Sequence, residues 1–182
     1  MNNSTIKLMF LASQKFESGK AVRGAFLLTD SETKPNEFRC TNPIRPTSLQ
    51  NILYGDTMEQ YILVELIGKP LYTTISEKPN LILVKDPTFL DLRPKISTPI
   101  LQLTKEEEIN TAQRGNGDFQ LFTSSTGKFD PIVVKTHYQF PDDKNLAKEM
   151  LGPIFNRYDL TEPFNRISVA LEQVHIQKIG EV

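Results

Sequence analysis

The sequence predicts an α+β protein with a mostly antiparallel sheet built from hairpins and with helices packed on one face. Short apolar segments separated by turn-rich linkers occupy the first 42 residues, and a helical stretch follows them. A second group of short apolar segments then precedes an amphipathic helix. We expect one domain over 1–182, with 1–92 and 115–182 as the halves that a Pro-rich, acidic connector could separate.

Three strands are expected first, at 5–12, 24–29 and 36–41. The linker DSETKP between the last two is rich in turn residues and has the length that closes a hairpin. In the third strand Phe38 and Cys40 alternate with charged or hydroxyl side chains. This period of two is typical of a half-buried strand.

The helical region begins at Thr47, since Gln50 stands three residues later, where a capping box requires it. The helix then places three apolar side chains on one face: Leu49, Ile52 and Leu53. Thr57 and Gln60 repeat the capping pattern before a helix over 58–68. A short helix over 70–77 and an apolar, buried strand over 81–86 complete this region.

The middle of the chain is interrupted by three prolines between 87 and 100. PILQLT, from Pro99, reads as an edge strand because proline cannot donate to a ladder. A short acidic surface helix is expected over 104–113, followed by a loop that includes RGNGD. Residues 104–117 could be ordered or could become ordered only on binding.

The second half predicts strands over 118–123 and 131–140, and a helix from Asp142 or Asp143 to Leu151. Thr161 then begins a last helix with an apolar stripe of four residues: Phe164, Ile167, Leu171 and Val174. We expect this stripe to bind a protein partner.

The composition favours a cytoplasmic protein. Lys and Arg total 21 against 22 acids, so the net charge of −1 does not support nucleic-acid binding through a basic surface. The longest apolar runs, LMFLA and YILVELIG, are too short for a membrane span or a signal peptide. One cysteine excludes an internal disulfide.

A thiol nucleophile would require Cys40 together with His137 or His175. Cys40 shares its strand face with Phe38, and this position favours core packing over catalysis. Two histidines and one cysteine are too few ligands for a typical zinc site. We therefore predict no catalytic residue, no metal and no cofactor.

Two further motifs suggest chemistry. SSTGK contains Gly-Lys, but a strand rather than a helix follows it, so it is a hairpin loop and not a P-loop. Asp86 and Asp91 flank the end of an apolar strand, and Glu65 or Lys85 could join them in a nuclease-like acidic site. A strand-ending turn explains the pair Asp86-Pro87 equally well.

Arg39 and Arg45 lie on either side of a stiff connection that leads to the helix start at Thr47. Two guanidinium groups and the first N–H groups of a helix could together hold an anion. In the alternative interpretation, Arg39 lies on the exposed face of its strand, Pro43 and Pro46 stiffen the connection, and Arg45 pairs with a local acid such as Glu37.

The block GAFLLTD…EFRCTNPIRPTSLQNILYG, with KPLYTTISEKPNLILVKDP after it, resembles a family of uncharacterised bacterial proteins. The resemblance covers about half of the chain. It implies a bacterial origin and assigns no site residue.

Two functions follow from these patterns. The first is a non-enzymatic binding or scaffolding subunit of a larger bacterial assembly, with another protein or a second copy as its partner. The alternative is a small enzyme or accessory factor that acts on a phosphate-bearing substrate such as nucleic acid, for example in bacterial defence.

Overall fold

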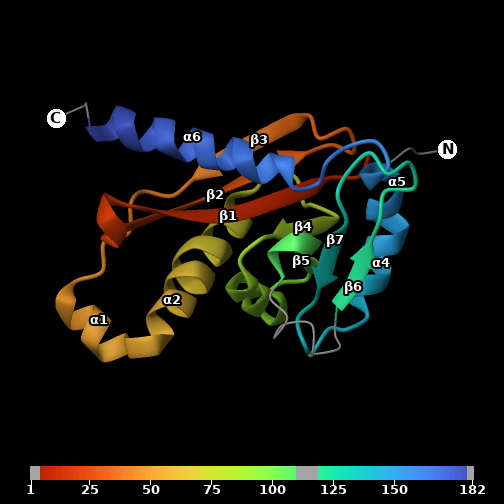
Figure 1. The fold of residues 1–182 in the computed structure, drawn as a ribbon. Coiled ribbons are helices and arrows are strands. Elements are labelled where there is room, and N and C mark those ends of the chain that lie inside the picture. Colours follow the sequence, from red (N-terminus) through yellow and green to blue (C-terminus); the bar gives the residue numbers. More distant parts are fainter. Residues whose placement is uncertain (1–4, 110–118, 180–182) are drawn as a thin grey trace.

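A seven-stranded mixed sheet forms the centre of the molecule (Figure 1). The computed structural model describes residues 5–109 and 119–179. The strand order is β3-β2-β1-β4-β5-β7-β6. The strands are β1 (Leu8–Phe16), β2 (Ala21–Thr29), β3 (Pro35–Cys40), β4 (Leu81–Val84), β5 (Ile100–Lys105), β6 (Phe119–Phe122) and β7 (Ile132–Lys135).

The centre of the sheet is parallel, which corrects the mostly antiparallel prediction. β1 pairs with β4, and β4 pairs with β5, in parallel. The outer strands pair antiparallel, as the hairpin linkers predicted for β2 and β3. β5 lies between β4 and β7, so the prediction of an edge strand is wrong. Pro99 removes no hydrogen bond from the sheet because it precedes the strand, and its carbonyl accepts the N–H of Ile82.

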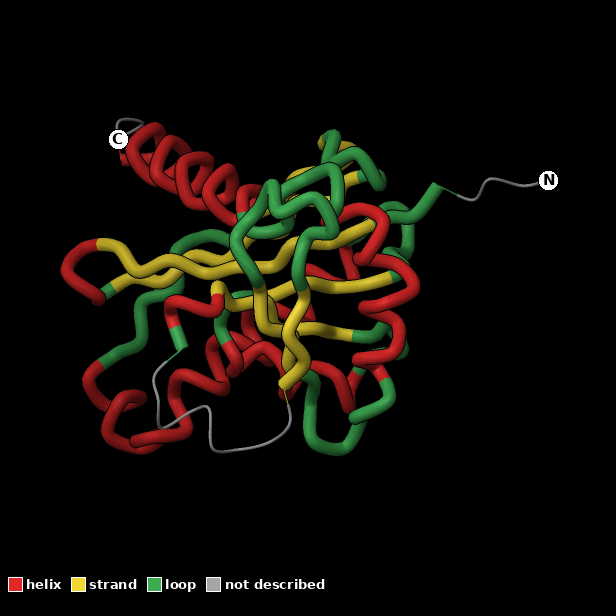
Figure 2. Tube along the Cα trace, turned by 45° about the vertical axis from the view of Figure 1, so that its right-hand side comes forward, coloured by secondary structure: helices red, strands yellow, loops and turns green. Residues whose placement is uncertain are grey.

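Helices cover both faces of the sheet, whereas the sequence predicted one (Figure 2). Alternate residues of β1 supply the two cores: Phe10 packs with α6 (Glu162–Ile179), and Leu11 packs with the helices that follow β3. Strands buried on both faces read as continuous apolar runs. This explains LMFL in β1 and LILV in β4.

The helices after β3 form a continuous series on one face. They are α1 (Ser48–Tyr54), a single turn over Gly55–Thr57, α2 (Met58–Gln60), wider π-helical turns over Tyr61–Gly68, and α3 (Lys69–Thr74). The capping box of Thr47 and Gln50 is confirmed by both reciprocal hydrogen bonds. The second predicted cap is wrong, because the Thr57 hydroxyl donates to the Tyr54 carbonyl instead.

Helix α1 presents its apolar side chains to solvent. Its apolar face is exposed at three positions: Leu49, Ile52 and Leu53. In Figure 1 the helix lies at the end of the molecule, away from the sheet. The helical spacing was therefore predicted correctly, but spacing alone does not say whether another element covers the face.

The second half adds its strands to the same sheet. β6 and β7 are shorter than the predicted strands over 118–123 and 131–140. The expected helix over 104–113 is mostly replaced by β5, which continues to Lys105, and by one turn over Glu106–Glu108; positions 110–113 lie outside the described residues. A 3-10 helix over Pro87–Lys95 and the helices α4 (Asp143–Leu146), Ala147–Leu151 and α5 (Gly152–Phe155) complete the fold.

The apolar stripe of α6 packs inside the chain. Phe164, Ile167 and Leu171 are buried in the core formed with β1 and β2, and Val174 is half-buried. Phe164 meets the ring of Phe10 edge to face, with 5.4 Å between ring centroids. The first three side chains are therefore not available to a protein partner, and the stripe is corrected to a core contact.

Candidate functional site

The carboxyl ends of the parallel strands β1 and β4 lie together at one edge of the sheet. β1 pairs with β4 only through Leu11, so its residues from Ala12 to Phe16 continue past the last residue of β4. Directly after β4 come Lys85 and Asp86. Ligands of open sheets bind beyond the carboxyl ends of parallel strands, where the order of connections reverses. β1 is such a point, with β2 on one side and β4 on the other.

Two hollows open at this edge and share three residues: Ser13, Gln14 and Asp86. The larger one has a volume of about 1040 Å³ and lies towards α1 and α2. The smaller one has a volume of about 580 Å³ and lies against the first turns of α6. Polar side chains therefore line a continuous path over the edge of the sheet, with Asp86 on both sides of it.

Charged side chains of both signs line the larger hollow. The cations come from the region of the β1–β2 turn and from the chain after β3: Lys15, Lys20 and Arg45. The acids come from the start of α2 and from the end of β4: Asp56, Glu59 and Asp86. A bound anion is attracted to the cations, while the acids offer carboxylates to a reacting group.

The carboxylates do not form a metal cage. Asp86 is half-buried, and one of its oxygens accepts the N–H of Thr88 at 2.9 Å. Glu59 is exposed on the same hollow. Within residues 5–109 and 119–179, no three of His, Cys, Asp or Glu are grouped so that they could hold a metal ion. A metal enclosed by protein ligands therefore does not fit the described side chains.

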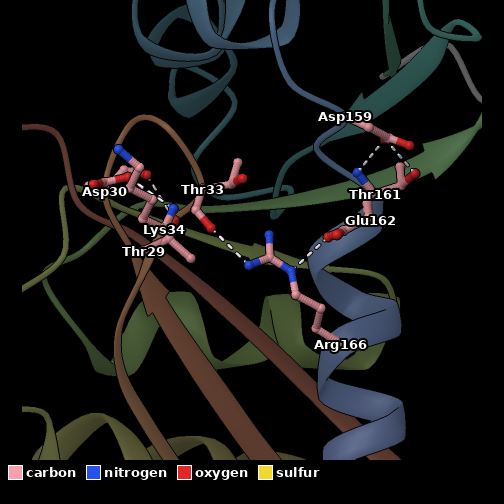
Figure 3. A network of polar contacts seen from close by, with 8 residues as sticks. All are labelled: Thr29, Asp30, Thr33, Lys34, Asp159, Thr161, Glu162 and Arg166. Carbon is pink, nitrogen blue, oxygen red and sulfur yellow. Dashed lines mark hydrogen bonds and ion pairs between the residues drawn. The ribbon is translucent and has the colours of Figure 1, made fainter.

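The smaller hollow has a firmly held rim (Figure 3). Asp159 accepts both the N–H and the hydroxyl of Thr161 at 2.8 Å. Arg166 pairs with Glu162 at 2.7 Å and donates to the carbonyl of Thr33 at 2.8 Å. These bonds tie the start of α6 to the β2–β3 turn. Asp159, Thr161 and Glu162 line the hollow, together with Lys85 and Lys105.

The predicted anion site is divided in the structure. Arg39 pairs with Glu37 at 2.6 Å, and it lines neither hollow. Burial raises the pKa of the Glu37 carboxyl, but hydrogen bonds from the N–H and hydroxyl of Ser76 and from Arg39 outweigh it, so the pKa is lowered. Thr47 uses its hydroxyl as the helix cap. Of the three residues, Arg45 alone lines the larger hollow.

The acidic cluster considered from the sequence is also divided. Lys85 and Asp86 line the smaller hollow together. Asp91 instead accepts the side-chain amide of Gln60 at 2.9 Å, and Glu65 pairs with Lys95. Neither Asp91 nor Glu65 lines the two hollows.

The thiol and the imidazoles serve other contacts. Cys40 is free and packs against the core on the α6 side. His137 is buried near Asp91, with 3.6 Å between its Nε2 and a carboxylate oxygen. His175 is buried on α6, where its Nδ1 accepts the Nε–H of Arg23 at 2.9 Å. The thiol, like both rings, lines neither hollow.

Sequence reasoning missed Gln14 and Glu59. Gln14 lies beyond the apolar run of β1, and Glu59 follows the single turn after α1. The first carried a usable signal, because a polar residue that directly follows a buried strand lies at a sheet edge. Glu59 carried none, since its place depends on how α2 packs.

Fold and site geometry together define an α+β protein with a parallel core and two charged hollows at the carboxyl ends of its strands. No protein-family model and no curated protein sequence matches the chain. Solved structures do match it, and those most similar include Endonuclease V from three organisms.

The matches extend over nearly all of the chain. Human ENDOV has a TM-score of 0.56 with 12% identity, covering 98% of this chain and 87% of its own. Endonuclease V of Streptomyces avermitilis has a TM-score of 0.56 with 10% identity, covering 96% and 83%. That of Bacillus subtilis has a TM-score of 0.53 with 10% identity, covering 96% and 82%. The chain has the Endonuclease V fold.

This finding corrects three sequence-based predictions. The chain has the fold of a characterised nuclease family, so assigning it to a family without known function is wrong. The interpretations as a scaffolding subunit and as a non-enzyme are wrong for the same reason, since the match is to an enzyme over almost the full length. No helix among the described residues is long and apolar enough to cross a membrane.

Proposed function

We propose that this chain is an enzyme that acts on nucleic acid, with a strand bound across the carboxyl ends of β1 and β4. One observation carries the proposal: the fold of an endonuclease extends over the chain, and the edge at β1 and β4 bears two charged hollows that meet at Asp86. A net charge of −1 does not oppose it, because the cations required are local. Phosphate contacts come from individual side chains, so a chain of low net charge can bind a strand through a local group of cations.

The chain positions of the cations that line the larger hollow suggest how a strand would lie. Lys15, Lys20 and Arg45 would contact phosphates on the side of the β1–β2 turn. The reacting phosphate would then lie towards Asp86, between the two hollows. Lys85, beside Asp86 in the smaller hollow, would hold the continuation of the strand.

In this arrangement Asp86 serves as the general base. The oxygen of a water molecule bonds to phosphorus, and the bond from phosphorus to one bridging sugar oxygen breaks. The proton of the water passes to the Asp86 carboxylate, and the released sugar oxygen takes a proton from solvent. A well-placed general base contributes about 10²–10⁴-fold to rate.

The test is cleavage of end-labelled oligonucleotides by the purified chain in a buffer that contains Mg²⁺. The panel holds single-stranded DNA, duplex DNA, RNA and a DNA that contains an inosine followed by a ribo-adenosine, as in the DNA crystallised with Ciona intestinalis Endonuclease V. We expect internal cleavage of at least one substrate and its loss in Asp86→Asn. The matched control is Asp91→Asn, because Asp91 lines neither hollow. Equal rates for both variants, or no cleavage by the wild type, would reject the proposal.

A further inference from the structure

Glu17 lies between two positively polarised groups, one of which, Arg45, lines the larger hollow. Its carboxylate accepts the Nε–H and an Nη–H of Arg45 at 3.1 and 3.3 Å. On its other side, one of its oxygens is 3.8 Å from Nε2 of His175. This separation is too long for a hydrogen bond.

The Nε2 atom of His175 needs an acceptor. Because arginine only donates, the bond from Arg23 fixes the lone pair of the neutral imidazole on Nδ1 and its proton on Nε2. The ring is 5% exposed, and it stacks on Phe16 with 4.2 Å between ring centroids. Its Nε2 is buried and has no hydrogen-bond partner among the described residues. A buried donor without a partner is rare and unfavourable.

Two features make Glu17 able to move. It belongs to a turn in which three successive residues have positive φ: Glu17 at 54°, Ser18 at 55° and Gly19 at 87°. The first two are not glycine, so this backbone is strained. The pair with Arg45 is partly exposed, with 51% of the Arg45 side chain accessible. Exposed pairs of this kind are weak and readily exchanged.

We propose that Arg45 binds phosphate and that its carboxylate partner, Glu17, then leaves Arg45 and pairs with His175. We call this change of partner the exchange. The guanidinium then holds the phosphate with two parallel hydrogen bonds, the bidentate geometry that arginine offers to phosphate as well as to carboxylate. Glu17 moves inward and accepts the unpaired Nε2–H of His175. His175 is a positioning residue, because it contacts Glu17 and not the ligand. This inference rests on the proposed function for its natural ligand, a nucleic-acid strand.

The first test measures affinity for a fluorescein-labelled ten-nucleotide single strand. Glu17→Gln leaves Arg45 without its charged partner, so we expect about two- to fivefold tighter binding. The matched control is Glu32→Gln, which removes the same charge from an exposed pair with Lys34 at the other end of β2. Arg45→Ala should weaken binding, and Glu17→Gln should then bring no gain in that background. Equal effects of Glu17→Gln and Glu32→Gln would overturn the exchange.

The second test follows the imidazole nitrogens by NMR during titration with pyrophosphate. The chain has two histidines, so His137 serves as an internal reference. The exchange predicts that the Nε2–H signal of His175 moves to a hydrogen-bonded position and that this change is absent in Arg45→Ala. An unmoved His175 signal overturns the exchange. If wild type cleaves nucleic acid while His175 does not respond, the exchange fails and the proposed function stands. If His175 responds but wild type cleaves no nucleic acid, the exchange stands and the proposed function fails.

Discussion

Gly24 is the position where a single methyl group tests the packing of β2 against the helical turns that follow α2. It lies in β2, where its backbone faces Ile67 in the π-helical turns after α2. A Cβ built at Gly24 would be 2.0 Å from Cγ2 of Ile67 and 3.1 Å from its Cβ and Cδ1. Carbon atoms pack at about 3.5–4.0 Å, so the two elements would have to separate by about 1.5 Å.

The expected cost of Gly24→Ala follows from the rigidity of both elements. β2 is paired on both edges, and Ile67 is completely buried. Overpacking a rigid core costs about 1–3 kcal/mol, and we expect the upper end, about 3 kcal/mol. For a chain of this size, such a loss lowers Tm by about 6–12 °C. Thermal unfolding followed by circular dichroism measures this change.

Two variants make the test specific. Gly152→Ala is the control, because a Cβ at Gly152 meets no atom within 4 Å, and it should leave Tm unchanged or slightly higher. Ile67→Ala removes the clashing Cγ2, so Gly24→Ala should cost less than about 1 kcal/mol in that background. If the two substitutions are additive, the close contact does not limit stability and the reasoning is refuted.

Two further changes test stability elsewhere in the fold. Glu37→Gln should cost about 1 kcal/mol at pH 7 through the weakened bonds from Ser76. Because the folded pKa of Glu37 lies below its ordinary value of 4.5, this contribution is present above pH 4.5 and is lost as the pH falls through the folded pKa. Denaturant titrations should therefore show the largest difference between the two proteins at pH 7, and this difference should shrink as the pH is lowered below 4.5 through the folded pKa. Asp143→Ala leaves Arg93 without its partner in a pair whose side chains are 13% and 10% exposed, and should cost about 3 kcal/mol in urea titrations. A loss no larger than that of Asp142→Ala, its exposed neighbour, would contradict this estimate.

Local patterns predicted local structure well. The capping box at Thr47 joins residues three positions apart, and the helical spacing of the α6 stripe is set by residues along one helix; both are present. The run at 81–84 was identified as a buried central strand because its composition fits burial on both faces. These features depend on neighbours along the chain, and the sequence therefore contains the information needed to recognise them.

The parallel pairing of β1, β4 and β5 was not predictable from the same patterns. Periodicity shows that a strand is buried but does not show which strand lies beside it. Proline at the start of β5 suggested an edge, although Pro99 only precedes the ladder. The candidate site depended on this pairing, since Gln14 and Asp86 come together only when β1 and β4 are parallel neighbours.

The central claim is that a nucleic-acid strand lies across the carboxyl ends of β1 and β4. Its most direct test is backbone amide NMR of the 15N-labelled chain during titration with a short single-stranded oligonucleotide. We expect the largest shifts between Ser13 and Lys20 and at Lys85 and Asp86, with small shifts in β6. Shifts concentrated in β6 and β7, or none at these strand ends, would contradict the account.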